Sequence, residues 1–318
     1  MSLAISVVIP TYQRSAAVRR VLESLARQTL GATDFEVVVS IDGSNDDTRE
    51  IVSAFTAPYG LEALWQPNGG RASACNAGIR AARGDVVVLL DDDMEASPDF
   101  LAAHQRAHVG ARRRAVIGAV PVVADTPGPL ADYIRAGFER RMARLATSGY
   151  AIQFNDVYTG NFSISRATML EVGGFDERFR YYGHEDYELA LRLLRAGVQI
   201  VYSGEALAHH HYGKDFAAVA HDSMGRGRND VLFVAKYPEI RTRLRLHASG
   251  GRRPTRLARR MLLMVSAIIT ATPRWVVALV QRLERRRGAR LDACYDFTLD
   301  YFYWLGARAA RREPGRMA

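Results

Sequence analysis

The stretch VVVLLDDDMEASPDF, residues 86–100, runs five apolar residues directly into three consecutive aspartates. A continuous apolar run of this length is typical of a strand that is buried on both faces of a sheet. Three neighbouring carboxylates repel one another, so they are stable at such a place chiefly when a cation or hydrogen-bond donors lie among them. The stretch therefore predicts a buried strand whose carboxyl end carries a cation-binding tip.

Other apolar runs of the first half alternate with helical segments, which predicts an α/β domain with a mostly parallel sheet covered on both faces. We expect strands at 4–9, 35–41 and 85–90, a short run near 61–66, and helices after PTYQR, around 46–56 and at about 71–82. The segments PTYQR, DGSNDD and DDDME each follow a strand. They should therefore meet at the carboxyl edge of the sheet, where such sheets bind ligands.

The second half of the chain is less regular. Strand-like segments occur at 115–123, 160–165 and 198–203, and a helix is expected at about 185–196. Its composition changes sharply after residue 240. The last 78 residues carry 18 arginines and 5 acidic residues, a net charge of +13, which leaves −4 for residues 1–240 of the total of +9. The sequence thus predicts a mildly acidic domain with a strongly basic extension.

Cysteine usage and the N-terminus bear on the compartment. The 318-residue chain has two cysteines, Cys75 and Cys294, with neither CxxC nor metal-ligand spacing, which favours a reducing compartment. The N-terminal apolar run is too short for a signal peptide. We therefore expect a cytoplasmic protein.

The three aspartates suit a hard divalent cation. In an extended segment Asp91 and Asp93 share one side while Asp92 points to the other. Carboxylate oxygens favour Mg2+ or Mn2+. The alternative is that the aspartates cap the helix that follows them, since Asp favours helix starts.

Five motifs together carry a resemblance to a known family. They are VVIPTYQR, VSIDGSNDDT, NGGRASACNAGIRAARGDVVVLLDDD, NFSISRATMLEVGGFDERF and GHEDYELALRLLRAG. In this order and at these separations they resemble the family 2 glycosyltransferases of the GT-A fold, over roughly residues 4–212. The resemblance implies a Rossmann-like α/β catalytic domain over 1–240, with a nucleotide-sugar-binding half at 1–110, an acceptor half at 111–240, and a basic amphipathic helical extension at 241–318.

The resemblance also implies where a nucleotide-sugar donor binds. The residues expected to contact it are Pro10, Thr11, Tyr12, Arg14, Asp42, Arg71, Asn76, Asp91 and Asp92. Asp42 corresponds to the family aspartate that accepts a hydrogen bond from the base, which favours a UDP- or dTDP-sugar; its alternative role is to cap the turn DGSNDD. The first strand is not followed by GxGxxG, so a nicotinamide enzyme is disfavoured.

A metal site is implied at the aspartate tip. Asp93 is the firmest expected ligand, and Asp91 is expected to contact the metal or the ribose. A histidine after a later strand commonly supplies a third ligand, and HHH at 209–211 offers three. Spacing favours His210, although Gly204 stands where the family usually has proline. His209 remains an alternative, as does a solvated strand end without metal.

The acidic pair in GHEDYELALRLL offers a catalytic base. Inverting sugar transfer needs a carboxylate that takes the proton of the attacking acceptor hydroxyl. By resemblance Asp186 is the expected base and Glu185 is expected to bind the acceptor, while Asn161 and Asp156 are expected to line the acceptor pocket. The alternative is ordinary helix-start chemistry for Glu185 and Asp186.

The basic extension contains an apolar pattern at helical spacing, formed by Leu257, Met261, Met264, Val265, Ile268 and Thr272. The run 261–272 is shorter than the roughly twenty residues that span a bilayer. We expect a helix at the inner face of the cell membrane, where lipid-linked or glycan acceptors of cell-envelope synthesis lie. The alternative is packing on the catalytic core or on a second copy of the chain. Nucleic-acid binding would leave residues 1–240 unexplained and is not expected. A further alternative is a nucleotide-sugar-binding protein that has lost catalysis, against which the presence of both the metal and the base motifs argues.

Overall fold

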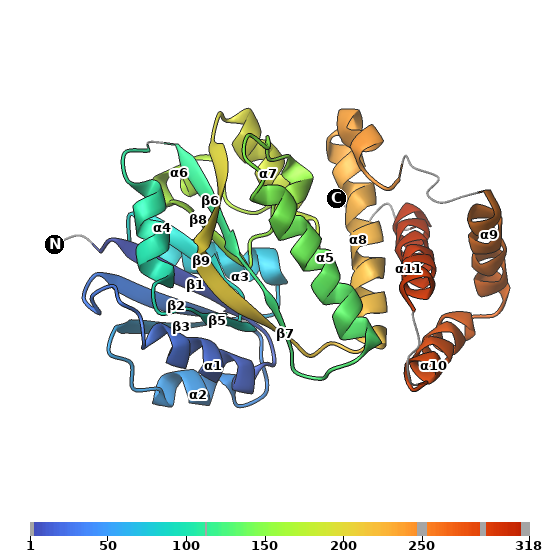
Figure 1. Cartoon of the computed structure of the whole chain (residues 1–318), viewed down its shortest axis with the longest axis horizontal. Helices are drawn as coiled ribbons and strands as arrows, with labels where there is room; N and C mark the ends of the chain where they lie inside the picture. The colour runs from blue at the N-terminus through green and yellow to red at the C-terminus, as the bar shows by residue number, and fades with distance from the viewer. Residues whose placement is uncertain (1–2, 112, 247–252, 287–290, 313–318) are drawn as a thin grey trace. The chain divides into compact units, whose positions relative to one another are not determined.

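The computed structural model describes residues 3–111, 113–246, 253–286 and 291–312. The chain divides into two compact units (Figure 1). The first comprises residues 1–125, 135–180 and 185–212, and the second comprises residues 126–134, 181–184 and 213–318.

The first unit is built on a nine-stranded sheet, counted over the described residues, with the order β3-β2-β1-β4-β8-β6-β9-β5 and β7 paired to β9. Its strands are β1 Ile5–Thr11, β2 Phe35–Asp42, β3 Gly60–Gln66, β4 Val86–Leu90, β5 Met94–Ala96, β6 Arg114–Ala119, β7 Val122–Ala124, β8 Asn161–Ser165 and β9 Gln199–Tyr212. Strands β1 to β4 are parallel to one another, whereas β8 runs antiparallel to both β4 and β6. The expected α/β architecture is confirmed.

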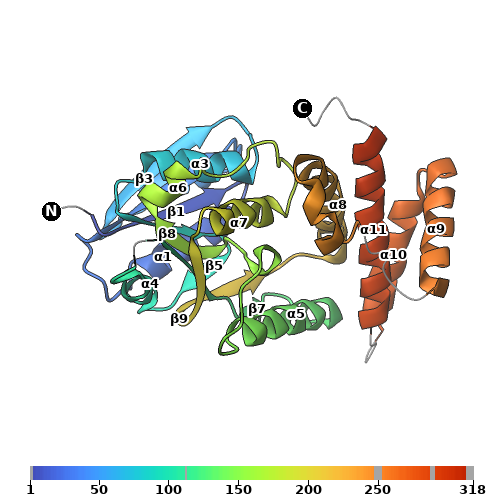
Figure 2. The same cartoon turned by 90° about the horizontal axis from the view of Figure 1, so that it is seen from above.

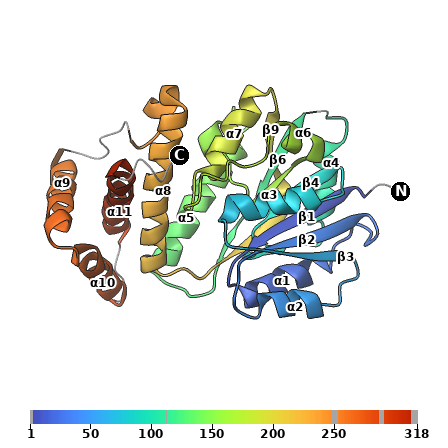
Figure 3. The same cartoon turned by 180° about the vertical axis from the view of Figure 1, so that it is seen from behind.

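Helices cover both faces of this sheet. The helices of the first unit are α1 Ser15–Leu25, α2 Thr48–Ala54, α3 Arg71–Ala81, α4 Phe100–His108, α6 Arg166–Glu171 and α7 Glu185–Arg195, with η1 Phe154–Asp156 and the C-terminal part of α5 Pro129–Leu145. Figure 3 shows α3 on one face of β1–β3 and α1 and α2 on the other. Because both faces are covered, every residue of β1 and β2 is buried, which explains their largely apolar sequences.

The close packing of α3 on the sheet depends on a glycine. A Cβ added at Gly78 would lie 2.3 Å from Val8 Cγ1 and 2.8 Å from Ser40 Oγ. Only a residue without a side chain lets the helix lie this near β1 and β2. The contact holds the N-terminus of α3, with its Arg71, at the carboxyl edge of the sheet.

Several sequence-based boundaries differ from the structure. The segment predicted as one strand at 115–123 is two strands, β6 and β7. Strand β9 extends to Tyr212 and takes in the whole histidine triplet. Helices α5 and α8 were not predicted. The three aspartates do not cap a helix, because β5 follows them directly and α4 begins only at Phe100 with Asp99 as its N-cap.

The second unit is helical, with α8 Phe216–Lys236, η2 Pro238–Arg243, α9 Arg253–Ile268, α10 Thr272–Glu284 and α11 Asp292–Arg312. Figure 2 shows α9 and α10 alongside α11. Helices α8 and α11 lie so close that a Cβ on Gly227 would come within 1.9 Å of the Tyr303 carbonyl, and a Cβ on Gly306 within 1.9 Å of the Met224 carbonyl. This glycine-mediated packing groups α8 with the C-terminal helices, so the contact boundary lies near residue 212, whereas the sequence placed the start of the extension at 241.

The apolar pattern of the basic extension spans two helices. Leu257 to Ile268 lie on α9, but Thr272 begins α10 and is buried, so it is not part of the exposed stripe. The break agrees with Pro273, a residue suited to the first turn of a helix. Within the described ranges, none of the helices combines the length and the hydropathy that crossing a membrane requires.

Candidate active site

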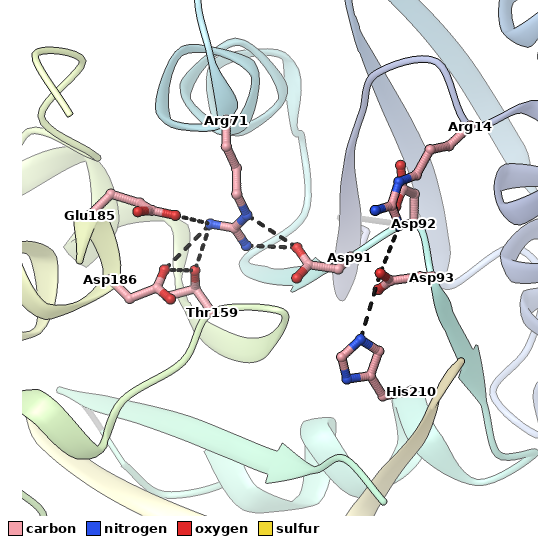
Figure 4. A network of polar contacts seen from close by, with 9 residues as sticks. All are labelled: Arg14, Arg71, Asp91, Asp92, Asp93, Thr159, Glu185, Asp186 and His210. Atoms are coloured by element: carbon pink, nitrogen blue, oxygen red, sulfur yellow. Dashed lines mark hydrogen bonds and ion pairs between the residues drawn. The ribbon is translucent and has the colours of Figure 1, made fainter. Parts of the chain in front are cut away.

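Polar side chains from six segments of the first unit meet at the carboxyl edge of the sheet (Figure 4). Arg14 follows β1, the three aspartates follow β4, Arg71 opens α3, Thr159 precedes β8, Glu185 and Asp186 open α7, and His210 lies on β9. These elements are far apart in the sequence. Their convergence follows from the parallel strands, whose carboxyl ends share one edge.

The aspartate tip is a turn and not an extended segment. The Met94 N–H donates to the Asp91 carbonyl at 3.2 Å, closing the turn before β5 begins. We expected an extended segment in which Asp91 and Asp93 share one side and Asp92 points to the other; this expectation is wrong, because the segment is a turn. Asp91 instead faces Arg71, while Asp92 and Asp93 both face Arg14.

Arg14 neutralises part of the negative charge at this turn, and Thr11 donates a hydrogen bond to it. Arg14 Nη1 lies 2.8 Å from Asp93 Oδ2 and 3.4 Å from Asp92 Oδ1, and the Thr11 hydroxyl donates to Asp92 Oδ2 at 2.8 Å. Burial raises the pKa of Asp92 to about 7, and the charge of Asp93 adds to this effect. Burial acts in the same sense on Asp93, but the His210 hydrogen bond and the Arg14 charge hold its pKa below the ordinary value.

Of the histidine triplet, His210 is the residue that faces the aspartates. Its Nε2 lies 3.6 Å from Asp93 Oδ2, and its Nδ1 is buried without a hydrogen-bond partner among the described residues. His211 is bound elsewhere, with Nε2 2.9 Å from Glu95 Oε2 and Nδ1 3.1 Å from Asp125 Oδ1. Because neighbouring residues of a strand point to opposite faces, His209 shares the side of His211. The triplet thus favours His210 as the ligand candidate.

The donor set at this turn suits a hard divalent cation, although it is not a closed cage. Within the described part of the chain, no three His, Cys, Asp or Glu side chains gather closely enough to hold a metal by themselves. Asp93 and His210 offer two donors side by side, and Asp91 belongs to the same turn. An oxygen-rich, partly open set of this kind is what Mg2+ and Mn2+ use when substrate phosphates and water complete their coordination. The residues therefore fit the expected metal.

Arg71 connects the aspartate turn to the acidic pair. Its Nη2 lies 2.7 Å from Asp91 Oδ1, and its Nη1 lies 3.4 Å from Asp186 Oδ1 and 3.6 Å from Glu185 Oε1. Nη1 also donates to the Thr159 hydroxyl at 2.9 Å. One guanidinium thus balances three carboxylates from two parts of the sequence (Figure 4).

Thr159 is a member of this network that the sequence did not reveal. It is fully buried, and its hydroxyl donates to Asp186 Oδ1. A threonine in the segment before a strand carries no motif of its own. The only available signal was its position two residues before NFS of β8, at the edge where the other site residues meet.

The two members of the acidic pair have different environments. The Glu185 side chain is 4% exposed and that of Asp186 is 20% exposed. Burial and, to a smaller extent, the charge of Asp186 raise the pKa of Glu185 against the opposing charge of Arg71, to about 8. Glu185 is thus suited to carry a proton near neutral pH, while the more accessible Asp186 is held by Thr159 and Arg71. Neighbouring carboxyl groups with separated environments are the usual arrangement for an acid and a base.

Asp42 is buried at the end of β2 and fastens the NGG loop. Its two oxygens accept hydrogen bonds from the backbone N–H groups of Gly69 and Gly70, at 2.9 and 2.8 Å, and Oδ1 also accepts from Gln66 Nε2 at 2.8 Å. Gly70 has a φ of +88°, which suits glycine. Asp42 therefore holds the loop that leads into Arg71. The alternative role considered from the sequence, capping the turn DGSNDD, did not include this loop.

The remaining expected donor contacts differ in accessibility. Tyr12 is 48% exposed at the end of β1, and Pro10 is buried within that strand. Asn76 is engaged on both sides of its amide: Oδ1 accepts from the Phe175 N–H at 2.8 Å, and Nδ2 donates to the Phe175 carbonyl and to Glu177 Oε1. Asn76 thus attaches the GGFDE segment to α3.

Asn161 and Asp156 do not line a pocket, contrary to expectation. Asn161 is fully buried, and its amide donates to the carbonyls of Ala119 and Ala206. Asp156 is 3% exposed and accepts from Arg144, from the Tyr150 hydroxyl and from a backbone N–H. Both buried side chains thus have their polar atoms engaged by other groups of the protein.

Comparison with known sequences gives one family match and several named relatives. The family model described as Glycosyl transferase family 2 matches residues 6–176, more than half of the chain. A validoxylamine A glucosyltransferase of Streptomyces hygroscopicus subsp. jinggangensis is 33% identical over 234 residues, which cover 64% of this chain and 54% of that protein. A chondroitin synthase of Escherichia coli is 26% identical over 237 residues, covering 65% and 34%. The chain thus spans about half the length, or less, of these relatives.

Solved structures resemble the chain in fold. The mannosyltransferase PcManGT from Pyrobaculum calidifontis, in complex with GDP-Man and Mn2+, has a TM-score of 0.59 at 17% identity, covering 97% of this chain and 87% of that one. S. aureus TarS 1–349 in complex with UDP-GlcNAc has a TM-score of 0.58 at 16% identity, covering 98% and 92%. At these identities the likeness concerns the fold alone.

Proposed function

The chain belongs to glycosyl transferase family 2, and on this premise we propose that it is a metal-dependent inverting glycosyltransferase that moves a sugar from a nucleoside-diphosphate donor to an acceptor hydroxyl. The observation that carries this proposal is the polar network around Arg71. It links the aspartate turn, where a diphosphate would bind, to the acidic pair, where a hydroxyl would lose its proton. The two halves of a transfer reaction thus meet at one guanidinium.

The donor would bind at the aspartate turn with its diphosphate near Arg14 and Arg71. Asp93, His210 and Asp91 would hold Mn2+ or Mg2+, which when bound neutralises the charge that develops on the departing diphosphate. Arg14 and Arg71 at present balance the carboxylates of the turn. Both can turn part of their hydrogen bonding to phosphate oxygens, for which guanidinium geometry is well suited.

Asp186 would act as the base. The Thr159 hydroxyl and Arg71 both engage Oδ1, which leaves Oδ2 for the acceptor. As the acceptor oxygen forms its bond to the anomeric carbon, its proton passes to Asp186 and the bond to the diphosphate oxygen breaks, its electron pair leaving with the diphosphate. Attack on the face opposite the leaving group inverts the anomeric centre. Glu185, protonated near neutral pH, would donate a hydrogen bond to the acceptor.

We propose a UDP- or dTDP-sugar as the donor. The proposal rests on Asp42, whose family counterpart accepts a hydrogen bond from the imide of the base. Asp42 already accepts three hydrogen bonds, and a carboxylate has about four acceptor positions, so one remains for a base. The structurally similar proteins include complexes with a uridine and with a guanosine nucleotide: TarS with UDP-GlcNAc and PcManGT with GDP-Man.

The test is a donor panel with the full chain. UDP-, dTDP- and GDP-linked sugars are supplied with Mn2+, and release of the nucleoside diphosphate is measured with and without EDTA. Loss of a general base typically costs about 10²- to 10⁴-fold, so Asp186→Asn should lower turnover by that factor. The matched control is Asp99→Asn, at another helix start outside the site. Turnover that survives EDTA, or that Asp186→Asn leaves unchanged, would contradict the proposal.

We further propose that the enzyme acts at an anionic membrane surface, on a glycan or lipid-linked acceptor of cell-envelope synthesis. The helices α9 and α10, with the turn between them, expose the apolar side chains of Leu257, Met261, Met264, Val265, Ile268, Ile269, Trp275 and Leu279. Exposed arginines on the same helices and just beyond them are Arg260, Arg274, Arg282, Arg285 and Arg286. An apolar stripe bordered by arginines is typical of a helix that lies in the interface of an anionic bilayer.

The structure also bears on the packing alternative. One side of α9 contacts α11, since Arg259 pairs with Asp300 and Ser266 hydrogen-bonds to Tyr301 at 2.6 Å. The exposed apolar side chains of α9 are therefore those that its packing on α11 leaves uncovered. A second copy of the chain could cover them instead, but the exposed arginines would then face those of the copy, whereas an anionic bilayer complements them.

Vesicle co-sedimentation tests this part of the proposal. The chain should bind phosphatidylglycerol vesicles and not phosphatidylcholine vesicles, and added salt should weaken binding. The double change Met264→Glu with Ile268→Glu should abolish binding, whereas Val109→Glu, at an exposed apolar residue of the first unit, should not. A stable dimer that the double change dissociates, with vesicle binding unaltered, would assign the stripe to a second copy.

A further inference from the structure

The GGFDE segment, residues 173–177, lies between the two helices that carry Arg71 and the acidic pair. Helix α3 opens with Arg71, and helix α7 opens with Glu185 and Asp186. The segment and both helices belong to the first unit. Side chains from each helix hold the backbone of this segment, so it joins the two helices to one another.

On the side of α3 the segment is held by Asn76. Its Oδ1 accepts a hydrogen bond from the Phe175 N–H at 2.8 Å, and its Nδ2 donates to the Phe175 carbonyl at 2.9 Å. A Cβ on Gly174 would lie 2.4 Å from Asn76 Oδ1, so the amide lies directly against this backbone. The Phe175 ring faces Arg71, with 5.9 Å between the guanidinium carbon and the ring centroid, within the range of a cation–π contact. The segment therefore contacts α3 at two side chains.

On the side of α7 the segment is held by Arg192. Its Nη1 donates to the Val172 carbonyl at 2.5 Å, and its Nη2 donates to the Gly174 carbonyl at 2.6 Å. Nε and Nη2 also donate to Glu188, four residues earlier on the same helix, at 2.9 and 2.7 Å. The Glu188 side chain is 0% exposed, and a buried carboxylate is costly unless it is paired. All three guanidinium nitrogens are thus engaged, in a planar arrangement that a lysine cannot reproduce.

We propose that Arg192 is a positioning residue for the acidic pair, which acts by tying α7 to α3 through the GGFDE segment. Helix α3 is fixed by its close packing on β1 and β2, so the segment gives α7 a fixed place relative to the sheet. Arg71 Nη1 is thereby held 3.4 Å from Asp186 Oδ1 and 3.6 Å from Glu185 Oε1. The inference rests on the proposed function, because it takes Asp186 as the base.

The other role open to Arg192 is to cap α6, which ends just before the carbonyls that it binds. Two backbone hydrogen bonds already close the end of α6, from the Gly173 N–H to the Leu170 carbonyl and from the Gly174 N–H to the Met169 carbonyl, both at 3.0 Å. A cap of α6 would also leave the contacts of Asn76 unexplained, since Phe175 lies beyond that turn. What the two anchors share is the segment between them.

The test compares two arginines of the first unit that each bind two backbone carbonyls. Arg192→Lys keeps a positive charge beside Glu188 but cannot hold both carbonyls and the carboxylate at once. Arg166 donates to the carbonyls of Ile79 and Arg80, at 3.3 and 3.0 Å, at the C-terminal end of α3 and outside the site. Arg166→Lys is therefore the matched control.

Hydrogen exchange followed by mass spectrometry reads the link without any substrate. In Arg192→Lys, amides of residues 172–177 and 185–191 should exchange about tenfold faster than in the wild type, with β1 to β4 unchanged. Asn76→Ala, which removes the anchor on the side of α3, should act on the same residues, whereas Arg166→Lys should exchange there as the wild type does. Either of the first two variants overturns the proposal if residues 185–191 exchange as in the wild type, or if the whole first unit exchanges faster.

Kinetics read the placement of the base. The probe is whichever UDP-, dTDP- or GDP-linked sugar the wild type turns over fastest with Mn2+. Arg192→Lys should lower kcat by about 10- to 100-fold, the size expected for a base misplaced by about 1 Å, with the donor KM unchanged. Arg166→Lys should leave both constants unchanged. An unchanged kcat in Arg192→Lys, or a loss that lies wholly in KM, would overturn the proposal.

A double-mutant cycle separates one shared link from two independent contacts. Because Arg192→Lys and Asn76→Ala break the same link at its two ends, the double variant should have about the kcat of the slower single variant. Losses in kcat that multiply would overturn the proposal. Unchanged turnover in Asp186→Asn would instead overturn the proposed base, whatever the exchange at residues 185–191 shows.

Discussion

Replacing Arg71 by methionine tests whether one guanidinium balances the carboxylates of the site. The Arg71 side chain is 22% exposed and faces Asp91, Asp186 and Glu185, whose side chains are 34%, 20% and 4% exposed. Removing one partner of a fully buried ion pair costs about 3–5 kcal/mol, and the partial exposure of Asp91 and Asp186 lowers this. We expect Arg71→Met to reduce the free energy of unfolding by about 2–3 kcal/mol at neutral pH.

The loss should grow as the pH rises. The pKa of Glu185 is raised from 4.5 to about 8, so between these values the folded protein holds a proton that the unfolded chain releases, and stability falls as the pH rises through that window. Arg71 opposes the rise, so its removal moves the pKa of Glu185 higher still. Above pH 8 the wild type can ionise Glu185, while the variant continues to lose stability. The difference between the two proteins should therefore be about 1 kcal/mol larger at pH 9 than at pH 6.

Urea unfolding at pH 6 and pH 9 measures both effects. Arg106→Met is the matched control, because Arg106 pairs with two carboxylates, of Asp99 and Glu205, on the exposed surface. This control should unfold nearly as the wild type does at both pH values. An Arg71→Met loss that is no larger than that of the control, or that is equal at pH 6 and pH 9, would refute the electrostatic reasoning.

Three other changes probe the site and its support. Thr159→Val removes the hydroxyl that donates to Asp186 while keeping the shape of the side chain. We expect kcat to fall about tenfold, with donor binding unchanged in calorimetry. An unchanged kcat would count against the network. Gly78→Ala places a methyl group 2.3 Å from Val8 Cγ1, so chemical denaturation should show a loss of about 1–3 kcal/mol. Asp42→Asn replaces a carboxylate oxygen, which accepts a hydrogen bond from the backbone N–H groups of the NGG loop, by an NH2 group that cannot accept one. The free energy of unfolding should fall by about 1–3 kcal/mol, and the affinity for the nucleotide-sugar should fall with it. Thermal shift measures both.

Much of the sheet unit could be predicted because its strands are buried on both faces. Strand β4 has a continuous apolar sequence and strands β1 and β2 have largely apolar ones, which signals burial directly. The edge strand β3 alternates between exposed and half-buried residues, and it appeared only as a short run. Helix α8 was missed because glycines 225 and 227 interrupt its pattern. Gly227 allows the close contact with α11, whose residue Tyr303 lies more than 70 positions away in the sequence, and Gly225 lies against the backbone of Tyr182.

The candidate site could be listed from motifs, but the contacts within it could not. The motifs pointed to Asp93, His210 and Asp186, yet Arg71 joins Asp91 to Asp186 across 95 positions of the sequence. The turn at Asp91 also depends on β5, a strand of three residues that only its pairing with β9 defines.

Two further differences between the predicted and the observed site, at Asn161 and Thr159, concern buried side chains. Asn161 was expected to line the acceptor pocket, but its amide donates to two backbone carbonyls of the core. Thr159 had no motif and proved to contact Asp186. Neither fact is visible without the neighbours that the fold brings together.

The central claim, that Asp93 holds a divalent ion through which a nucleoside diphosphate binds, is tested most directly by isothermal titration calorimetry. UDP, dTDP and GDP are titrated into the full chain with Mn2+, into the same protein with EDTA, and into Asp93→Asn. The account predicts that at least one of the three nucleotides binds with Mn2+ and that this binding disappears both with EDTA and in Asp93→Asn. Equal affinity in the wild type and in Asp93→Asn, or binding that EDTA leaves unchanged, would contradict it.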